Sequence, residues 1–210
     1  METADQGIRS WLEALASDAA TPGGGAAAGL AAATGAGLIS MVGRLTLGKP
    51  GFEDIEDRMR AVTDRADAER EAFLELADRD ARAFDAVLQA FRLPKRTEEE
   101  RAARTLRIQE AYEGAAAVPL QLAGRAVDLM ELAEDATAMG NPNAASDGYS
   151  AGSLLFASAL AAMANVRINA AGLSDPAKGQ ALVDRCDALR ERADVLLGQV
   201  EEAFLLRLAP

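Results

Sequence analysis

The sequence contains no histidine among its 210 residues. Without an imidazole, His-bearing zinc sites, the Glu-x-x-His di-iron pattern and Ser–His or Cys–His nucleophile pairs are all excluded. Any catalysis by this chain must therefore use Asp, Glu, Lys, Arg, hydroxyl, amide or backbone groups.

Cysteine is nearly as scarce, because Cys186 is the single one. No internal disulfide can form, and such a chain is typical of a reducing compartment. The N-terminus also lacks the charged segment, apolar segment and cleavage site of a secretory signal. We therefore expect a cytoplasmic protein.

Basic and aromatic residues are few. The chain has 22 Lys and Arg against 33 Asp and Glu, a net charge of −11, and no basic run exceeds two residues. Because nothing supplies a surface that follows phosphates, nucleic-acid binding is not expected. Aromatic residues make up 4% of the chain while Ala and Gly are abundant, which favours closely packed helices over a β-sandwich.

The apolar periodicity predicts an all-α fold, a bundle of about six helices in a single domain spanning 1–210. The expected helices cover residues 4–18, 26–47, 53–91, 97–138, 144–172 and 175–208. Thr97 and Glu100 form a capping-box pattern at the start of the fourth helix. The second helix carries a run of Ala and Gly over 26–42. We interpret this run as buried in a bundle or dimer, because it is too short and too weakly hydrophobic to span a membrane.

A polar turn, Gly140–Asp147, precedes the apolar fifth helix. A carboxylate at the mouth of a buried helix can have its pKa and hydrogen bonds tuned, so Asp147 is a candidate site residue. The alternative is that Asn143 or Ser146 simply caps the helix, and the residues alone favour this second interpretation.

Two carboxylates, Glu69 and Asp80, fall on the apolar stripe of the third expected helix. A buried charge is costly unless it is paired or functional. Asp80 is therefore equally compatible with a structural ion pair to an Arg of another helix and with a role in a site.

Three further features are candidates for ligand binding. Gly23–Gly25 precedes a helix, so its amides can cradle an anion or admit a close approach, although it lacks the spacing of a phosphate loop. Lys49 and Lys95 each follow the end of an expected helix, where a lysine can hold a carboxylated ligand.

Helix geometry separates some of the polar candidates. Asp147, Asn165 and Asn169 fall on one face of the fifth helix, but Asp147 and Asn165 are about 27 Å apart along it. They cannot contact one small substrate within a protomer. We interpret Asn165, Arg167 and Asn169 as a polar packing layer, with a supporting role in a site or a dimer contact as the alternative.

Five short motifs follow one another along the chain: Pro22-Gly23-Gly24-Gly25, Leu45-Thr46-x-Gly48-Lys49, Asp80-x-x-Ala83-Phe84 with Leu93-Pro94-Lys95, Gly140-Asn141-Pro142-Asn143-Ala144-x-Ser146-Asp147, and Asn165-Val166-x-Ile168-Asn169. Together they resemble the cyclodeaminase/cyclohydrolase family of tetrahydrofolate enzymes. Gly148–Tyr149, directly after the fourth motif, departs from the small apolar residues expected there.

The resemblance implies an all-α homodimer that acts on one-carbon tetrahydrofolates without a metal or a redox cofactor. A cyclohydrolase adds water to 5,10-methenyltetrahydrofolate and gives the 10-formyl form. A cyclodeaminase closes 5-formiminotetrahydrofolate to the methenyl form and releases ammonia. The sequence contains no formiminotransferase domain, which favours the cyclohydrolase. A helical dimer that binds folate without catalysis is the alternative of another class.

The resemblance also implies roles for single residues. Asp147 or Asp80 is expected to be the base that accepts a proton from water, and Lys49 or Lys95 to orient the substrate or hold its glutamate tail. The residues assigned to substrate binding are Asn143, Ser146, Lys95, Gly24 and Gly25, and those assigned to catalysis are Asp147, Asp80 and Lys49.

Overall fold

The computed structural model describes residues 2–208, and over this range it is helical, with no strand. The α-helices are α1 (Ile8–Leu15), α2 (Gly24–Thr46), α3 (Glu56–Arg92), α4 (Glu98–Met139), α5 (Ala145–Ala170) and α6 (Pro176–Leu208), with 3-10 turns at Thr3–Asp5, Glu53–Ile55 and Pro142–Ala144. The predicted all-α bundle is confirmed. Residues 1 and 209–210 of the expected domain lie outside the described residues.

The boundaries follow the sequence signals closely except in the first helix. The capping box at Thr97 is present, since the Thr97 side chain accepts from the Glu100 amide and the Glu100 carboxylate accepts from the Thr97 amide. The expectation of a helix over 4–18 is wrong in extent. The backbone is extended at Gln6 and Gly7, so α1 begins only at Ile8.

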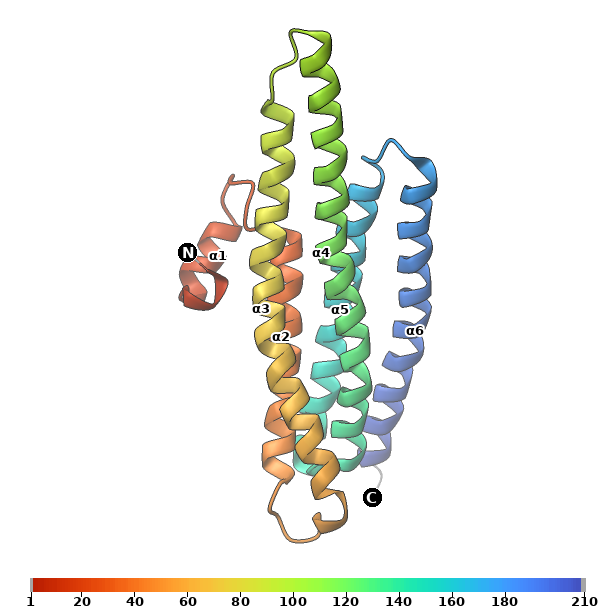
Figure 1. Cartoon of the computed structure of the whole chain (residues 1–210). Coiled ribbons are helices and arrows are strands. Elements are labelled where there is room, and N and C mark those ends of the chain that lie inside the picture. The colour runs from red at the N-terminus through yellow and green to blue at the C-terminus, as the bar shows by residue number, and fades with distance from the viewer. Residues whose placement is uncertain (1, 209–210) are drawn as a thin grey trace.

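The five long helices form two layers (Figure 1). One layer consists of α2 and α5, which pack side by side. The other consists of α3, α4 and α6, of which α3 packs on α2, α6 packs on α5, and α4 contacts all four. The short α1 lies outside α3 in Figure 1, where Trp11 packs against Ala26 and Ala77. Within residues 2–208, no long helix covers the opposite side of the α2/α5 layer (Figure 1), although Ala27 and Leu30 of α2 pack against the Trp11 cluster.

Small residues let α2 approach its neighbours closely. A Cβ on Gly29 would lie 2.9 Å from the Phe73 carbonyl oxygen of α3, and one on Gly35 would lie 3.1 Å from the Ala151 carbonyl oxygen of α5. α2 and the segment Pro142–Ala170 are long and apolar enough to cross a membrane by length and composition. In this fold 61% of the apolar window of α2 and 44% of that of Pro142–Ala170 are buried inside the bundle.

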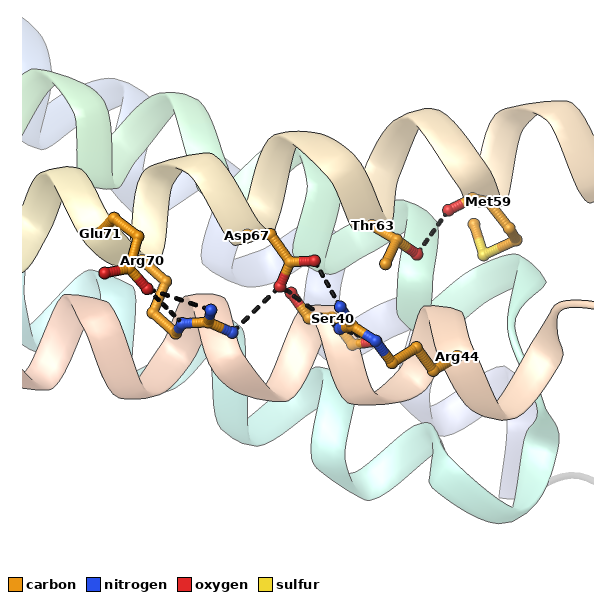
Figure 2. A network of polar contacts seen from close by, with 7 residues as sticks. All are labelled: Ser40, Arg44, Met59, Thr63, Asp67, Arg70 and Glu71. Atoms are coloured by element: carbon orange, nitrogen blue, oxygen red, sulfur yellow. Dashed lines mark hydrogen bonds and ion pairs between the residues drawn. The ribbon is translucent and has the colours of Figure 1, made fainter.

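A polar network ties α2 to α3 along their outer edge (Figure 2). The Asp67 carboxylate of α3 accepts hydrogen bonds from Ser40 and Arg44 of α2 and from Arg70 of its own helix. The hydrogen bond from Arg44 is the main reason that the pKa of Asp67 is lowered. The network links α2 to α3 and so helps to fix the register of the two helices.

The loops divide between the two ends of the bundle (Figure 1). At one end the α2–α3 loop lies beside the α4–α5 turn, because the Asn141 amide donates to Thr46 Oγ1 and the Asn141 side chain donates to the Leu45 carbonyl. The α3–α4 loop lies at the opposite end. This division decides which predicted site residues can meet.

Candidate active site

A cavity of about 170 Å³ opens beside the N-terminus of α2. Its walls come from the segment before α2 and from four of the long helices. The lining residues are Ala20, Thr21, Gly23, Gly24, Gly25, Asp80, Phe84, Ala115, Asn165 and Asn169. We call this space the Asp80 cavity.

The Asp80 carboxylate is half-buried and forms no hydrogen bond or ion pair with any other described residue. Burial raises the pKa of Asp80 above its ordinary value. The carboxylate also lies directly against the start of α2, since a Cβ on Gly25 would be 2.1 Å from Asp80 Oδ2. Any side chain at position 25 would clash with the Asp80 carboxylate, so this position of Asp80 requires glycine there. The result is an unpaired base, partly withdrawn from water, on a cavity wall.

Asn165 and Asn169 border the same cavity from α5. The Asn169 amide nitrogen donates to the carbonyls of Ala115 and Asn165, and the Asn165 amide nitrogen donates to that of Ala161. These bonds fix both side chains, as expected of a polar packing layer, and leave their Oδ1 atoms free to accept from a ligand. The cavity wall thus carries both amides, for which the sequence left a supporting role in a site open as the alternative to a packing layer. In the sequence, these two asparagines stand out only as the first and last residues of the motif Asn165-Val166-x-Ile168-Asn169.

Arg167, the third residue of the expected polar layer, does not line the Asp80 cavity. Its guanidinium pairs with Asp187 of α6 at 2.7 Å, on the side of α5 away from α2. The three-residue polar layer expected from the sequence therefore consists of the two asparagines only.

The Gly140–Asp147 turn lies at the other end of the bundle. Asn141 caps the 3-10 turn Pro142–Ala144, because its Oδ1 accepts a hydrogen bond from the Asn143 amide. Neither Asn143 nor Ser146 caps α5 with its side chain, so the capping interpretation of these two residues is wrong. Asn143 and Ser146 are exposed, and Asp147 is half-buried in the first turn of α5.

The two residues after Asp147 face the protein interior. A Cβ on Gly148 would lie 2.4 Å from Thr137 Oγ1, and the Tyr149 ring stacks on Phe204 of α6 with centroids 5.1 Å apart. Their departure from the family pattern is explained by packing against α4 and α6.

The two candidate lysines, Lys49 and Lys95, lie at opposite ends of the bundle. Lys49 follows α2, where its amide donates to the Thr46 carbonyl, and it is exposed with no ion-pair partner among the described residues. We call Lys49, Asn143, Ser146 and Asp147 the Asp147 end. Lys95 is exposed in the α3–α4 loop at the far extremity of the bundle.

Apart from Lys95, the predicted site residues therefore form two groups within the chain. Gly24, Gly25 and Asp80 meet in the Asp80 cavity, while the Asp147 end lies beside Thr46. Gly25 and Thr46 are 21 residues apart on α2, which corresponds to about 31 Å. No single small substrate contacts both groups within one chain.

The chain is similar in sequence to proteins named as folate cyclohydrolases or cyclodeaminases. Residues 7–188 match the formiminotransferase-cyclodeaminase family. The chain is 38% identical over 195 residues to the methenyltetrahydrofolate cyclohydrolase of Methylorubrum extorquens, covering 93% of this chain and 94% of that protein. It is 35% identical over 201 residues to the formimidoyltransferase-cyclodeaminase of Rattus norvegicus, covering 94% of this chain and 37% of that protein.

A solved structure is similar over the whole length. The crystal structure of formiminotetrahydrofolate cyclodeaminase from Thermotoga maritima matches with a TM-score of 0.88 at 26% identity. The match covers 99% of this chain and 100% of that one.

Proposed function

The chain belongs to the formiminotransferase-cyclodeaminase family, and from that membership we propose that it is a methenyltetrahydrofolate cyclohydrolase. It adds water to the methenyl bridge of 5,10-methenyltetrahydrofolate and releases 10-formyltetrahydrofolate. The observation that carries the choice is the 38% identity to a cyclohydrolase over 94% of that protein's length. The similarity to the solved cyclodeaminase is lower, at 26%.

Asp80 is the proposed general base. The methenyl carbon is cationic and electrophilic, so the enzyme has to position a water molecule and accept its proton. As the water oxygen bonds to the methenyl carbon, Asp80 takes one water proton and a neutral tetrahedral adduct forms. The carboxylate also stabilises the positive charge of the substrate before the attack. Its unpaired state and raised pKa suit both tasks.

The second half of the reaction breaks the bond from the bridging carbon to N5. Protonated Asp80 returns its proton to N5 as this bond breaks, and the adduct hydroxyl loses its own proton to solvent as the formyl carbonyl forms. One water is consumed and one proton is released, which balances the conversion of a cation to a neutral product. No metal or redox cofactor enters the proposed chemistry, because the electrophile is already activated.

Other groups of the cavity have supporting roles. Asn165 and Asn169 present fixed amide oxygens that can accept from the attacking water or from pterin N–H groups. Phe84 offers a partly exposed aromatic ring to the flat pterin. Gly24 and Gly25 admit the substrate close to the backbone.

The remaining expectations are part of the proposal. Lys49, Asn143, Ser146 and Asp147 contact substrate from the Asp147 end, and Lys95 holds a glutamate tail from the α3–α4 loop. The protein works as a cytoplasmic homodimer, without nucleic acid or membrane as a partner. Its charge of −11 makes the few unpaired cations important for an anionic tail.

A cyclodeaminase is the second candidate, because the Thermotoga maritima cyclodeaminase matches this chain over its entire length. Both reactions pass through a tetrahedral carbon between two folate nitrogens, so the same carboxylate can serve either. A dimer that binds folate without catalysis is less well supported, since the chain has a carboxylate, Asp80, that no described residue pairs with.

The test is an assay of the pure protein with each substrate. With 5,10-methenyltetrahydrofolate we expect accelerated loss of the methenyl absorbance. With 5-formiminotetrahydrofolate we expect neither methenyl absorbance nor ammonia to appear. Activity on the second substrate alone would assign the cyclodeaminase, and binding of both without turnover would assign the non-catalytic dimer.

A further inference from the structure

α3 and α4 extend beyond α2 and α5 at the end of the bundle that holds the Asp80 cavity (Figure 1). Because Asp80 lies against the start of α2, α3 continues for about three turns past that point. α4 begins about four turns before Tyr112, which lies beside the residues that follow α5. We call Phe84, Phe91, Arg104 and Tyr112, on these extended parts of α3 and α4, the Phe91 surface.

The aromatic rings of the Phe91 surface continue from the wall of the Asp80 cavity. Phe84 lines the cavity, and Phe91 follows two turns later on α3, about 10 Å away. Tyr112 lies on α4 one turn before the cavity residue Ala115, and its ring meets that of Phe91 edge to face with centroids 6.1 Å apart. Phe84 is 39% and Phe91 45% exposed, so both rings are accessible to a flat ligand.

The Tyr112 ring is held in place by the segment after α5. A Cβ on Gly172 would lie 2.5 Å from Tyr112 Cζ, so the backbone lies directly against the ring. The Gln109 side chain donates to the Gly172 carbonyl and accepts from the Ser174 amide, which ties this segment to α4. The ring is therefore positioned before any ligand binds, which reduces the entropy cost of binding.

Arg104 differs from the arginines one turn before and after it on α4. Arg101 pairs with Glu98 at 2.9 Å, and Arg107 pairs with Glu110 at 2.7 Å. Arg104 forms no ion pair with any of the residues 2–208, and its Nε is buried without a hydrogen-bond partner. A half-buried guanidinium without a carboxylate is unfavourable unless a ligand supplies the anion.

The Phe91 residue fixes the position of this guanidinium. Arg104 Cζ lies 5.5 Å from the centroid of the Phe91 ring, and Arg104 Nη2 donates to the Phe91 carbonyl at the end of α3. The carbonyl takes one of the five N–H donors and none of the charge. A carboxylate is the group that matches a guanidinium held in this way, because it accepts two parallel hydrogen bonds.

The spacing of the Phe91 surface matches the half of a folate that does not react. With the pterin beside Phe84 and the one-carbon bridge beside Asp80, the aminobenzoyl ring extends along α3 towards Phe91. The glutamate carboxylates then lie roughly 10 Å beyond the bridge. Phe91 lies about 10 Å from Phe84, and Arg104 lies over its ring.

We propose that Phe91 and Tyr112 bind the aminobenzoyl ring of the substrate and that Arg104 binds a carboxylate of its glutamate. The inference rests on the proposed function for its substrate, and it adds the residues that recognise the remote half of that substrate. Lys95, in the adjacent α3–α4 loop, remains for the second carboxylate. Binding of the remote half holds the one-carbon bridge against Asp80.

Two substrates that differ only in the glutamate test Arg104. They are 5,10-methenyltetrahydrofolate and 5,10-methenyltetrahydropteroate, which lacks the glutamate. For the wild type we expect a KM about 10–100-fold higher for the pteroate, the value of a charge-assisted hydrogen bond. Arg104→Met should raise the KM of the folate by the same factor and leave the KM of the pteroate unchanged. Its kcat should stay within about threefold, because the contact is the same in the ground and transition states.

Arg190→Met on α6 is the matched control. Arg190 also lies over an aromatic ring, that of Phe156 at 5.3 Å, but it is paired with Asp194 at 2.8 Å. We expect this variant to keep both KM values. If Arg104→Met raises the KM of both substrates equally, Arg104 only holds the end of α3 and the assignment is wrong. Unchanged KM values for Arg104→Met would also overturn it.

Tyr112→Leu tests the ring contact, with a different expected pattern. Both substrates contain the aminobenzoyl ring, so the KM of each should rise by about 3–10-fold, the value of one aromatic pair. Phe156→Leu removes an aromatic ring that lies under Arg190 and should change neither KM. A Tyr112→Leu variant with an unchanged KM for the pteroate would refute the aromatic part of the inference.

Calorimetric binding separates this inference from the proposed function, since it needs no turnover. The wild type should bind tetrahydrofolate about 10–100-fold more tightly than tetrahydropteroate, and Arg104→Met should bind the two equally. A wild type that discriminates in this way but hydrolyses neither methenyl substrate would refute the proposed function alone. A wild type that hydrolyses both substrates with equal KM would refute the role of Arg104 alone. Absence of both binding and turnover would refute both.

Discussion

Glu69 and Asp80 lie on the same side of α3, three turns apart, yet they differ in their surroundings. Glu69 is 2% exposed and is held by Arg125 at 2.7 Å and Arg65 at 2.6 Å. Asp80 is also withdrawn from water but has no such partner. A buried carboxylate with two guanidinium partners stabilises a structure, and one left unpaired beside a cavity is available to a ligand.

The first consequence concerns stability against pH. The folded-state pKa of Asp80 is raised by burial, so its protonation favours the fold at low pH and that contribution is lost as the pH rises through this pKa. Asp80→Asn removes the buried charge and should raise the melting temperature at pH 7. The gain should shrink below about pH 4, where the wild-type carboxyl is protonated in both states. Thermal unfolding at the two pH values measures it, and a less stable variant at pH 7 would contradict this account of Asp80.

The second consequence concerns Glu69. Arg125→Met leaves the buried carboxylate with Arg65 alone, and we expect a loss of about 3 kcal/mol, the lower end of the range for breaking a buried ion pair. Arg60→Met, which breaks an exposed pair with Glu56, should change stability by less than about 0.5 kcal/mol. Urea unfolding compares the two, and equal losses would mean that Glu69 is not held as described.

The sequence identified both carboxylates as unusual but did not separate them. Their place on the apolar stripe follows from helical spacing alone. One partner of Glu69, Arg65, lies one turn away on α3. The other, Arg125, lies 56 residues away on α4, and only the packing of α3 against α4 brings it within reach. Long-range pairing of this kind has no local signal.

At the scale of elements, local signals were informative. Periodicity, the capping box at Thr97 and the turn residues between helices placed five of the six helices closely. The predicted bounds of the first helix were wrong, because nothing local distinguishes the extended backbone at Gln6–Gly7 from a continuing helix. The sequence also predicted a buried Ala/Gly-rich helix. It did not indicate that α2 and α5 would share one layer with one side left uncovered.

The close approach of α2 to α3 gives a prediction for this scale. A Cβ on Gly29 would lie 2.9 Å from both the Phe73 carbonyl oxygen and Ala77 Cβ, and a backbone carbonyl cannot rotate away. We expect Gly29→Ala to destabilise the protein by about 1–3 kcal/mol through overpacking. Gly198→Ala on α6 meets no atom within 4 Å and should stabilise by up to about 1 kcal/mol. Chemical unfolding of both variants is the measurement, and equal effects would argue against the tight α2–α3 contact.

At the scale of the whole molecule, the candidate site was only partly predictable. Helix rise alone separates Asp147 from Asn165 by about 27 Å, and the structure extends this separation to the two groups at opposite ends of α2. Which group surrounds the cavity depends on the packing of four helices around Gly25.

The central claim is that the Asp80 carboxylate is the base of a folate cyclohydrolase. The most direct measurement is the steady-state rate of methenyl absorbance loss for wild type and Asp80→Asn at saturating 5,10-methenyltetrahydrofolate. The account predicts a kcat reduced by about 10²–10⁴ in a variant that remains folded. Wild-type turnover by folded Asp80→Asn would contradict it.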